Sequence, residues 1–225
     1  MFKIFINFKT YPQGTGERAV GLAKACEELR GTEAGETERG VEIIPIVQAA
    51  DVFRIKEKVK IPVWVQHLDW QTQGTFTGWQ NLEAVIEAGA AGTLLNHSEH
   101  QIPPGMIKQT LVRVRDRDRV KFEVMVCCKT LGQMERLIKL KPDFIGYEVS
   151  ELIGGKISIT DASPKMIGHA KEICQEIPLI VGAGIHKAED LAQAKKLGTS
   201  GVLISSAVVL ASDPKEKITE FLKLL

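Results

Sequence analysis

The most constraining feature of this sequence is a repeated alternation of short β-rich runs with longer segments of helical periodicity. Eight β-rich runs follow one another: KIFINF, VEIIPIV, IPVWVQ, GTLLN, KFEVMVC, DFIGYE, PLIVGAG and GVLISSA. Segments of helical period lie between them, such as GERAVGLAKACEELR, KTLGQMERLIKL and KAEDLAQAKKLG. Strands that alternate with helices are typical of βαβ units in a parallel sheet. The fold class is therefore predicted to be α/β.

The number of units decides between an open and a closed sheet. Eight units in 225 residues average about 28 residues each, which is compact but sufficient for a βαβ unit. A count of eight favours a closed (β/α)₈ barrel over an open doubly wound sheet. No linker-like, low-complexity or charge-block segment interrupts the chain, so we predict a single domain over residues 1–225.

Composition and charge argue against several kinds of partner. The chain has 29 basic and 28 acidic residues, and a formal net charge of +1 predicts no overall basic surface for nucleic acid. No apolar run approaches the roughly 20 residues that span a bilayer, and the first apolar stretch lacks a signal-peptide cleavage site. The four cysteines form no C-x-x-C pair and show no metal-type spacing, which predicts reduced core thiols. We therefore expect a cytoplasmic protein with no membrane or nucleic-acid partner.

The first predicted strand, in KIFINFKTYP, ends in a cation. Side chains alternate between the two faces of a strand, so Ile4, Ile6 and Phe8 share one face. Asn7 and Lys9 share the other face, which would be solvated if the segment were an edge strand. A barrel has no edges, so there these two side chains would point into the mouth, where the active sites of this fold lie. A cation at that place is costly unless it meets an anion, so Lys9 predicts an anionic ligand.

Two further strand ends carry ionisable side chains. NHSEH follows the fourth run and brings His97 to the mouth, while FIGYE brings Glu148 there from the sixth. As alternatives, His97 could cap a backbone carbonyl, and Glu148 could form a salt bridge with Lys9. A carboxylate, an imidazole and an ammonium group at one place also suit proton transfer next to a carbonyl group. The carboxylate would remove a carbon-bound proton, the imidazole would relay protons between oxygens, and the cation would stabilise the enediolate.

The seventh and eighth runs end in small residues. Gly182 and Gly184 follow the seventh run, and Ser205 and Ser206 follow the eighth. Loops at these two positions commonly bind phosphate in this fold. A Gly-Ala-Gly sequence also suits a tight turn without a ligand, which is the alternative here. Together with the predicted anion site, the pattern indicates a small phosphorylated carbonyl compound as ligand.

The histidines give no sign of a metal site. His97 is the one histidine directly at a predicted strand end. His67 falls in the long connection after the third run, and we expect structural roles for it and for His100, His169 and His186. Neither a metal nor a cofactor is therefore predicted.

Two connections are unusually long and polar. They are HLDWQTQGTFTGWQ, at residues 67–80, and VSELIGGKISITDASP, at residues 149–164. Extra length after a strand lies on the face of the barrel that carries function. Glu151, in the second connection, is expected to face solvent.

At these residues the chain resembles the triosephosphate isomerase family, in its short archaeal-type branch, over nearly its whole length. INFKTY is similar to the family's Asn-x-Lys strand, and GTFTG to the loop that inserts into the neighbouring subunit. NHSEH resembles the segment with the catalytic histidine, and YEVSELIGG the segment with the catalytic glutamate and the mobile lid. The resemblance implies a TIM barrel that interconverts dihydroxyacetone phosphate and D-glyceraldehyde 3-phosphate through an enediolate, without a cofactor.

The resemblance also implies roles for individual residues. Glu148 would be the base and neutral His97 the electrophile and proton shuttle, an assignment taken from the well-known glutamate–histidine pair of triosephosphate isomerase itself. Lys9 would stabilise developing charge with Glu99 beside it, and Asn7 would orient the substrate. The remaining substrate-binding positions are Ile153, Gly154, Gly182, Gly184, Ser205 and Ser206.

The lid departs from the family pattern. Archaeal-type lids usually read Glu-Pro-Pro-Glu-Leu-Ile-Gly-Thr-Gly, whereas here Val149 and Ser150 replace the prolines and Gly155 and Lys156 end the segment. Loss of both prolines frees the φ angles, which predicts a looser open lid and a larger entropy loss on closing. A non-catalytic phosphosugar-binding barrel is therefore an alternative function. A metal-dependent sugar-phosphate epimerase is another.

The long third connection predicts a subunit contact. Trp70 and Trp79 flank it, and they could either stiffen the loop by local packing or lie in an interface. The resemblance favours the interface. We expect a homodimer or a homotetramer formed through residues 66–79, two states that the sequence does not distinguish.

Overall fold

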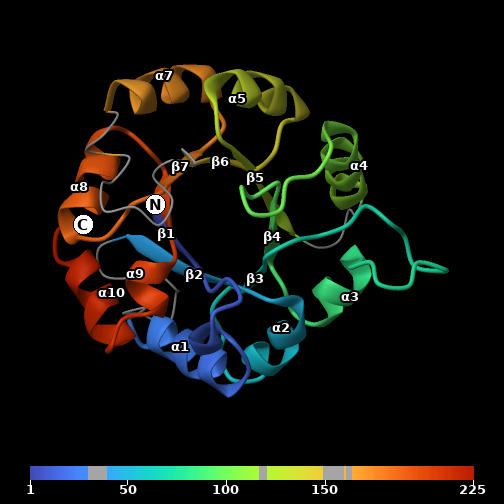
Figure 1. The fold of residues 1–225 in the computed structure, drawn as a ribbon, viewed down its shortest axis with the longest axis horizontal. Coiled ribbons are helices and arrows are strands. Elements are labelled where there is room, and N and C mark those ends of the chain that lie inside the picture. The colour runs from blue at the N-terminus through green and yellow to red at the C-terminus, as the bar shows by residue number, and fades with distance from the viewer. Residues whose placement is uncertain (30–39, 117–120, 149–159, 161–163) are drawn as a thin grey trace.

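The barrel predicted from the strand–helix alternation is present in the computed structural model, which describes residues 1–29, 40–116, 121–148, 160 and 164–225. Eight parallel strands close on themselves in the order β1-β2-β3-β4-β5-β6-β7-β8. Helices surround this barrel on its outside (Figure 1). The prediction of a closed (β/α)₈ barrel is confirmed.

Each of the eight predicted runs overlaps one strand. The strands are β1 Phe2–Asn7, β2 Val41–Val47, β3 Trp64–Val65, β4 Gly92–Leu95, β5 Glu123–Cys128, β6 Phe144–Glu148, β7 Leu179–Gly182 and β8 Gly201–Ile204. β3 is much shorter than the run IPVWVQ predicted. Pro62, in that run, has no backbone N–H to donate to a neighbouring strand.

The helices fill the connections between the strands. They are α1 Glu17–Glu28, α2 Ala49–Lys56, α3 Leu82–Glu87, α4 Pro104–Arg115, α5 Leu131–Leu137, α7 Pro164–Cys174, α8 Ala188–Lys196, α9 Ser206–Val209 and α10 Pro214–Leu222, with 3₁₀ turns at Pro12–Gly14 and Ile138–Leu140. Side chains of Asn81, Thr130 and Asp213 accept backbone N–H groups and so begin α3, α5 and α10. Among the described residues, no helix has the length and apolar character to cross a membrane.

The two faces of β1 lie in different layers, as its alternation predicts. Ile4 and Ile6 are fully buried in the cluster that packs beneath the helices. Phe5 belongs instead to the cluster inside the barrel, where its ring lies 4.9 Å from Trp64 and 5.7 Å from Phe144, centroid to centroid. Because this aromatic cluster fills the barrel, the side chains at the ends of the strands are left to line its mouth.

The cysteines are free and buried, as expected of core thiols: Cys26, Cys127, Cys128 and Cys174. Burial raises the pKa of the Cys26 thiol to about 12 and that of Cys174 to about 11. These thiols are therefore protonated and unreactive at neutral pH.

Candidate active site

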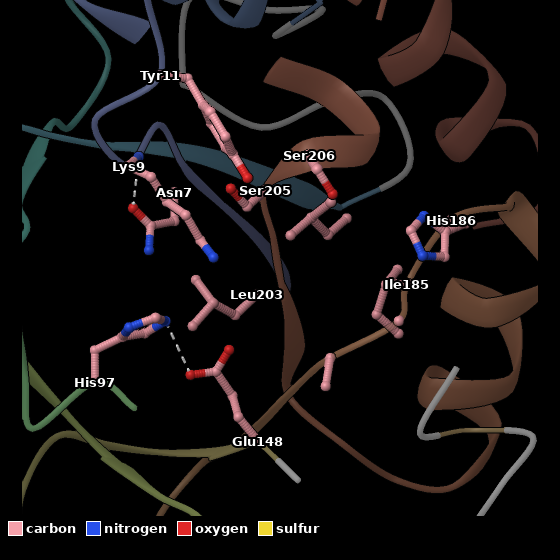
Figure 2. A pocket seen from close by; sticks show the side chains of 13 residues that line it. Asn7, Lys9, Tyr11, His97, Glu148, Ile185, His186, Leu203, Ser205 and Ser206 are labelled. Carbon is pink, nitrogen blue, oxygen red and sulfur yellow. Dashed lines mark hydrogen bonds and ion pairs between the residues drawn. The ribbon is translucent and has the colours of Figure 1, made fainter. Parts of the chain in front are cut away.

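A cavity opens at the carboxyl ends of the strands (Figure 2). Loops after β1, β7 and β8 contribute most of its wall, and β4 and β6 contribute one ionisable side chain each. The lining residues are Asn7, Lys9, Tyr11, His97, Glu148, Ala183, Gly184, Ile185, His186, Leu203, Ile204, Ser205 and Ser206.

The backbone at Lys9 is held in a strained, left-handed conformation. Its φ is 48°, and its N–H donates to Oδ1 of Asn7 at 3.0 Å. Gln66, directly after β3, donates from Nε2 to the Lys9 carbonyl at 2.9 Å and to Oδ1 of Asn7 at 3.3 Å. A left-handed conformation costs a non-glycine residue about 1–3 kcal/mol, and it persists only where neighbouring groups hold it in place. The two hydrogen bonds from Gln66 hold this conformation in place. Gln66 was not among the residues predicted from the sequence.

The ammonium group of Lys9 pairs with Glu99. Nζ lies 2.6 Å from Oε1 of Glu99, whose side chain is 55% exposed, whereas that of Lys9 is 17% exposed. In the alternative drawn from the sequence, Lys9 paired with Glu148 instead. The structure pairs Glu148 with His97, so the lysine charge stays in the cavity without neutralising that carboxylate.

The imidazole of His97 lies between two carboxylates. Its Nδ1 accepts the backbone N–H of Glu99 at 3.3 Å, and its Nε2 lies 3.2 Å from Oε2 of Glu148. Because Nδ1 accepts a hydrogen bond, the neutral ring carries its proton on Nε2, the nitrogen that faces Glu148 and the cavity. In the capping alternative, His97 would donate to a backbone carbonyl. Nδ1 instead accepts a backbone N–H.

Asn96 shapes the turn that carries His97 into the cavity. Asn96 has a φ of 60°, a region that Asn tolerates better than most residues. Its Nδ2 donates to the Cys127 carbonyl at 2.9 Å, and its Oδ1 accepts the Ile102 N–H at 3.1 Å. These two bonds tie the end of β4 to β5 and to the start of α4.

Glu148, the last residue of β6, presents a buried carboxylate to the cavity. Figure 2 shows it facing His97, with the side chains of Asn7 and Lys9 directed toward the same space. Within the part of the chain that the structure describes, Oε2 accepts no hydrogen bond, although Nε2 of His97 lies at ion-pair distance. A buried carboxylate oxygen in this state is available to take a proton from a ligand.

The charge on Glu148 affects the protonation of His97. Burial lowers the pKa of the imidazole, but its close contact with Glu148 and the negative charges of Glu148 and Glu99 raise it by more, with Lys9 opposing. The net result is a pKa above the ordinary value of 6.5. Contact with the two carboxylates therefore makes the imidazole easier to protonate than a free histidine side chain.

A pH dependence of stability follows from this pair. A group whose pKa is higher in the folded state contributes stability that is fully present below its unfolded-state pKa and is lost as pH rises through the folded value. We expect the unfolding free energy lost in His97→Gln to be largest below pH 6.5 and to shrink as pH rises above it. Urea unfolding of both proteins from about pH 5 to about pH 9 measures this difference. In a Glu148→Gln background this dependence should be lost or reversed, because burial, which lowers the pKa of His97, is then opposed only by the charge of Glu99. Curves that stay parallel in the original background would contradict the assignment.

The opposite wall of the cavity is a turn after β7. Ala183 and Gly184 have φ values of 77° and 69°, so two consecutive residues are left-handed. Asp190, buried on α8, accepts the backbone N–H groups of His186 at 2.8 Å and Lys187 at 3.1 Å. The carboxylate of Asp190 therefore anchors the turn from behind.

The predicted phosphate-binding residues are only partly brought together. Gly184, Ser205 and Ser206 line the cavity, and Ser206 begins α9, whose first N–H groups have no acceptor within the helix. Gly182 lies against the Glu148 side chain and is not among the lining residues. The lid positions lie outside the described residues: Val149, Ser150, Glu151, Ile153, Gly154, Gly155 and Lys156.

Two lining residues were missed or assigned otherwise from the sequence. Tyr11 was not singled out, and His186 was expected to be structural, yet both line the cavity (Figure 2). The available signal was their position, because each follows a strand end that already carried a candidate. Charge and motif gave no reason to choose them.

A second cavity adjoins the first across Lys9 and His97. Glu99, His67 and His100 contribute to its lining. The two histidines, for which we expected structural roles, therefore lie beside the site. The rings of His67 and His100 stack with centroids 4.3 Å apart. Burial lowers the pKa of His67, and its bond to Asp69 offsets this only in part. Among the described residues, no three His, Cys, Asp or Glu side chains are grouped so that they could hold a metal ion.

The loop between β3 and α3 extends outward from the barrel (Figure 1). Its base is closed by Asp69, which accepts the Gln80 N–H at 2.8 Å and donates its own N–H to the Gln80 carbonyl at 2.9 Å. Beyond this pair, Phe76 is 39% exposed and Trp79, next to Gln80, is 45% exposed. The loop thus presents two large apolar side chains to its surroundings.

A family model and the similar known proteins point to the same family. The family model described as Triosephosphate isomerase matches residues 2–224. A triosephosphate isomerase of Methanosarcina acetivorans is 35% identical over 226 residues, covering 99% of this chain and 98% of that protein. One from Methanothermus fervidus is 37% identical over 223 residues, with 97% and 96% coverage. The resemblance seen in the sequence is confirmed.

Proposed function

Because this chain belongs to the triosephosphate isomerase family, it is an isomerase of phosphorylated trioses, and we propose that Glu148, His97 and Lys9 carry out the reaction. The reaction interconverts dihydroxyacetone phosphate and D-glyceraldehyde 3-phosphate. One observation carries the assignment of residues. The buried Oε2 of Glu148, which accepts no hydrogen bond from the described residues, lies 3.2 Å from Nε2 of His97 at the mouth of the barrel.

Each side chain has one task in the proposed mechanism. Glu148 takes the proton from C1 of dihydroxyacetone phosphate, and the electron pair of the C–H bond forms the enediolate. The Nε2–H of His97 protonates the carbonyl oxygen and then removes the proton from the neighbouring hydroxyl. Glu148 returns its proton to C2, which completes the aldose. Lys9 stabilises the negative charge that develops on the two oxygens.

The phosphate group binds, in this proposal, at the wall formed by the loops after β7 and β8. Gly184, Ser205 and Ser206 line that wall, which supports their predicted role. The turn anchored by Asp190 keeps its backbone in a left-handed conformation, a geometry that exposes N–H groups to an anion. From the resemblance, Ile153 and Gly154 would close over the phosphate from the lid.

A coupled assay tests the proposed function. Dihydroxyacetone phosphate is added to the purified protein without added metal, and formation of D-glyceraldehyde 3-phosphate is followed through a second enzyme. We expect rapid turnover. If the protein bound inorganic phosphate but produced no aldose, the non-catalytic phosphosugar-binding alternative would replace this proposal.

We also propose that the active form is a homodimer or homotetramer built through the loop at residues 66–79. The exposed Phe76 and Trp79 support this, since large apolar side chains exposed on one loop are typical of an interface. Gln66, at the base of the loop, holds Asn7 and the Lys9 carbonyl, so the contact would reach the active site.

Disrupting this loop should affect both assembly and activity. We expect Phe76→Asp with Trp79→Asp to lower the mass measured by sedimentation and to reduce kcat by about 10²-fold, because small displacements of reacting groups have costs of this size. Phe53→Asp is the matched control, since Phe53 is 61% exposed on α2. An unchanged mass in the double variant would refute the assignment of the interface.

Two further proposals concern the chain as a whole. A single domain over residues 1–225 is supported by the family match, which covers residues 2–224. A cytoplasmic location is supported by four free, buried cysteines, the usual state of thiols in a reducing compartment.

A further inference from the structure

Gly182, the last residue of β7, lies directly beside Glu148 in the barrel. The two residues are register partners in the β6–β7 ladder. A Cβ at position 182 would lie 2.9 Å from Cγ of Glu148 and 3.0 Å from its Oε1. Real Cβ atoms essentially never approach another heavy atom closer than 3.0 Å, so any side chain at position 182 would displace the carboxylate.

The backbone conformation does not explain why this residue is glycine. Gly184 has a φ of 69°, which side chains rarely adopt. Gly182 is instead part of a regular strand and is not among the residues with positive φ. The glycine at position 182 is therefore required for the space it leaves.

The surroundings determine which atoms would move. The third close neighbour of the added Cβ is the Leu203 carbonyl oxygen at 3.2 Å, which belongs to the backbone of β8 and is held in the barrel. The Glu148 side chain is flexible by comparison. An added methyl group would therefore push the carboxylate away from β7 and change its distance to His97.

We infer that Gly182 is a positioning residue for Glu148: the absence of a side chain at position 182 sets where the carboxylate stands relative to the substrate carbon. This rests on the proposed function of Glu148 as the base. It also replaces the role predicted from the sequence, in which Gly182 bound the phosphate.

The variant Gly182→Ala separates these two roles. If Gly182 positions the base, kcat falls by about 10²-fold, the size expected from a shift of about 1 Å in a reacting group. Inhibition by inorganic phosphate then stays unchanged, because the turn at Gly184 and the loop at Ser205 are untouched. Gly146→Ala is the matched control. Its Cβ would lie 3.0 Å from Sδ of Met125 and 3.1 Å from Sγ of Cys127, inside the same barrel, and its nearest neighbours do not include Glu148.

The same substitution in a Glu148→Gln protein shows whether Gly182→Ala acts through the carboxylate. In Glu148→Gln the base is already lost, so adding Gly182→Ala should lower the residual kcat by less than about twofold, as expected when one substitution acts only through the other group. An equal loss in both backgrounds would mean general damage to the barrel and would overturn the inference. Weaker phosphate inhibition with unchanged kcat would restore the phosphate-binding role and overturn it as well.

A crystal structure of Gly182→Ala gives a readout that is independent of activity. The inference expects the Glu148 carboxylate to be displaced from its position in the unsubstituted protein, with the turn after β7 unchanged. A carboxylate that has not moved overturns the inference. An inactive unsubstituted protein would instead refute the proposed function, and the two failures are therefore distinguishable.

Discussion

Glu148→Gln is expected to lower kcat by about 10³- to 10⁴-fold, toward the upper end of the range for a general base. The amide keeps the shape of the carboxylate but has no oxygen basic enough to remove a proton from carbon. Oε2 of Glu148 is the buried carboxylate oxygen in contact with His97, and no other carboxylate is among the described residues that line the cavity. The KM should change little, because the proposed phosphate contacts come from the loops after β7 and β8. Steady-state kinetics in both reaction directions measures the effect.

Glu99→Gln is the matched control for this substitution. Glu99 also lies near His97, with Oε2 3.7 Å from Nδ1, but its side chain is 55% exposed and turned toward Lys9. The substitution removes the negative charge that pairs with Lys9 and leaves the contact between His97 and Glu148 in place. We therefore expect a smaller loss of kcat than for Glu148→Gln. If Glu99→Gln were the more damaging of the two, the base would have to be reassigned.

Lys9→Met is expected to lower kcat/KM by about 10³-fold, the size of losing one strong charge-stabilising group. Met keeps an unbranched stem of four heavy atoms and lacks the ammonium group, which the enediolate needs in a partly buried site. Most of the loss should lie in kcat, because the charge develops during the reaction and not on binding. Unfolding by urea should show a retained fold, since Gln66 bonds the Lys9 backbone carbonyl and the Asn7 side chain, neither of which changes.

Two comparisons sharpen the test of Lys9. Lys9→Arg should not restore full activity, because the longer, planar guanidinium cannot occupy the position of the ammonium group. Lys108→Met, on the exposed face of α4, removes one positive charge from the surface and serves as the control for net charge. A Lys9→Met enzyme with higher KM and unchanged kcat would show that Lys9 contributes only to binding.

Several features of the fold followed from the sequence because they depend on local periodicity. The eight runs predicted eight strands, and a closed parallel barrel left each strand one face under the helices and one inside. That is why Ile4 and Ile6 were assigned correctly to the outer layer and Asn7 to the mouth. β3 was overestimated, because an apolar run predicts burial but not how many of its residues pair with a neighbour.

The candidate site was predictable to the extent that it consists of strand ends. In a parallel barrel all carboxyl ends meet at one mouth, so Lys9, His97 and Glu148 had to lie near one another. His186 and Tyr11 were not predicted, since nothing in residue type or spacing indicates which way a loop side chain turns.

The sequence by itself determined the architecture, the end of the barrel that carries function and the ionisable residues gathered there. Only the tertiary structure decided that Glu148 pairs with His97 and not with Lys9, and that Gly182 lies directly against the carboxylate. The physical reason is the distance along the chain over which each feature is determined. Strand and helix periods are set by neighbouring residues, whereas pairing depends on which strands adjoin, on their register and on side-chain rotamers, all of which are defined only after the barrel has closed.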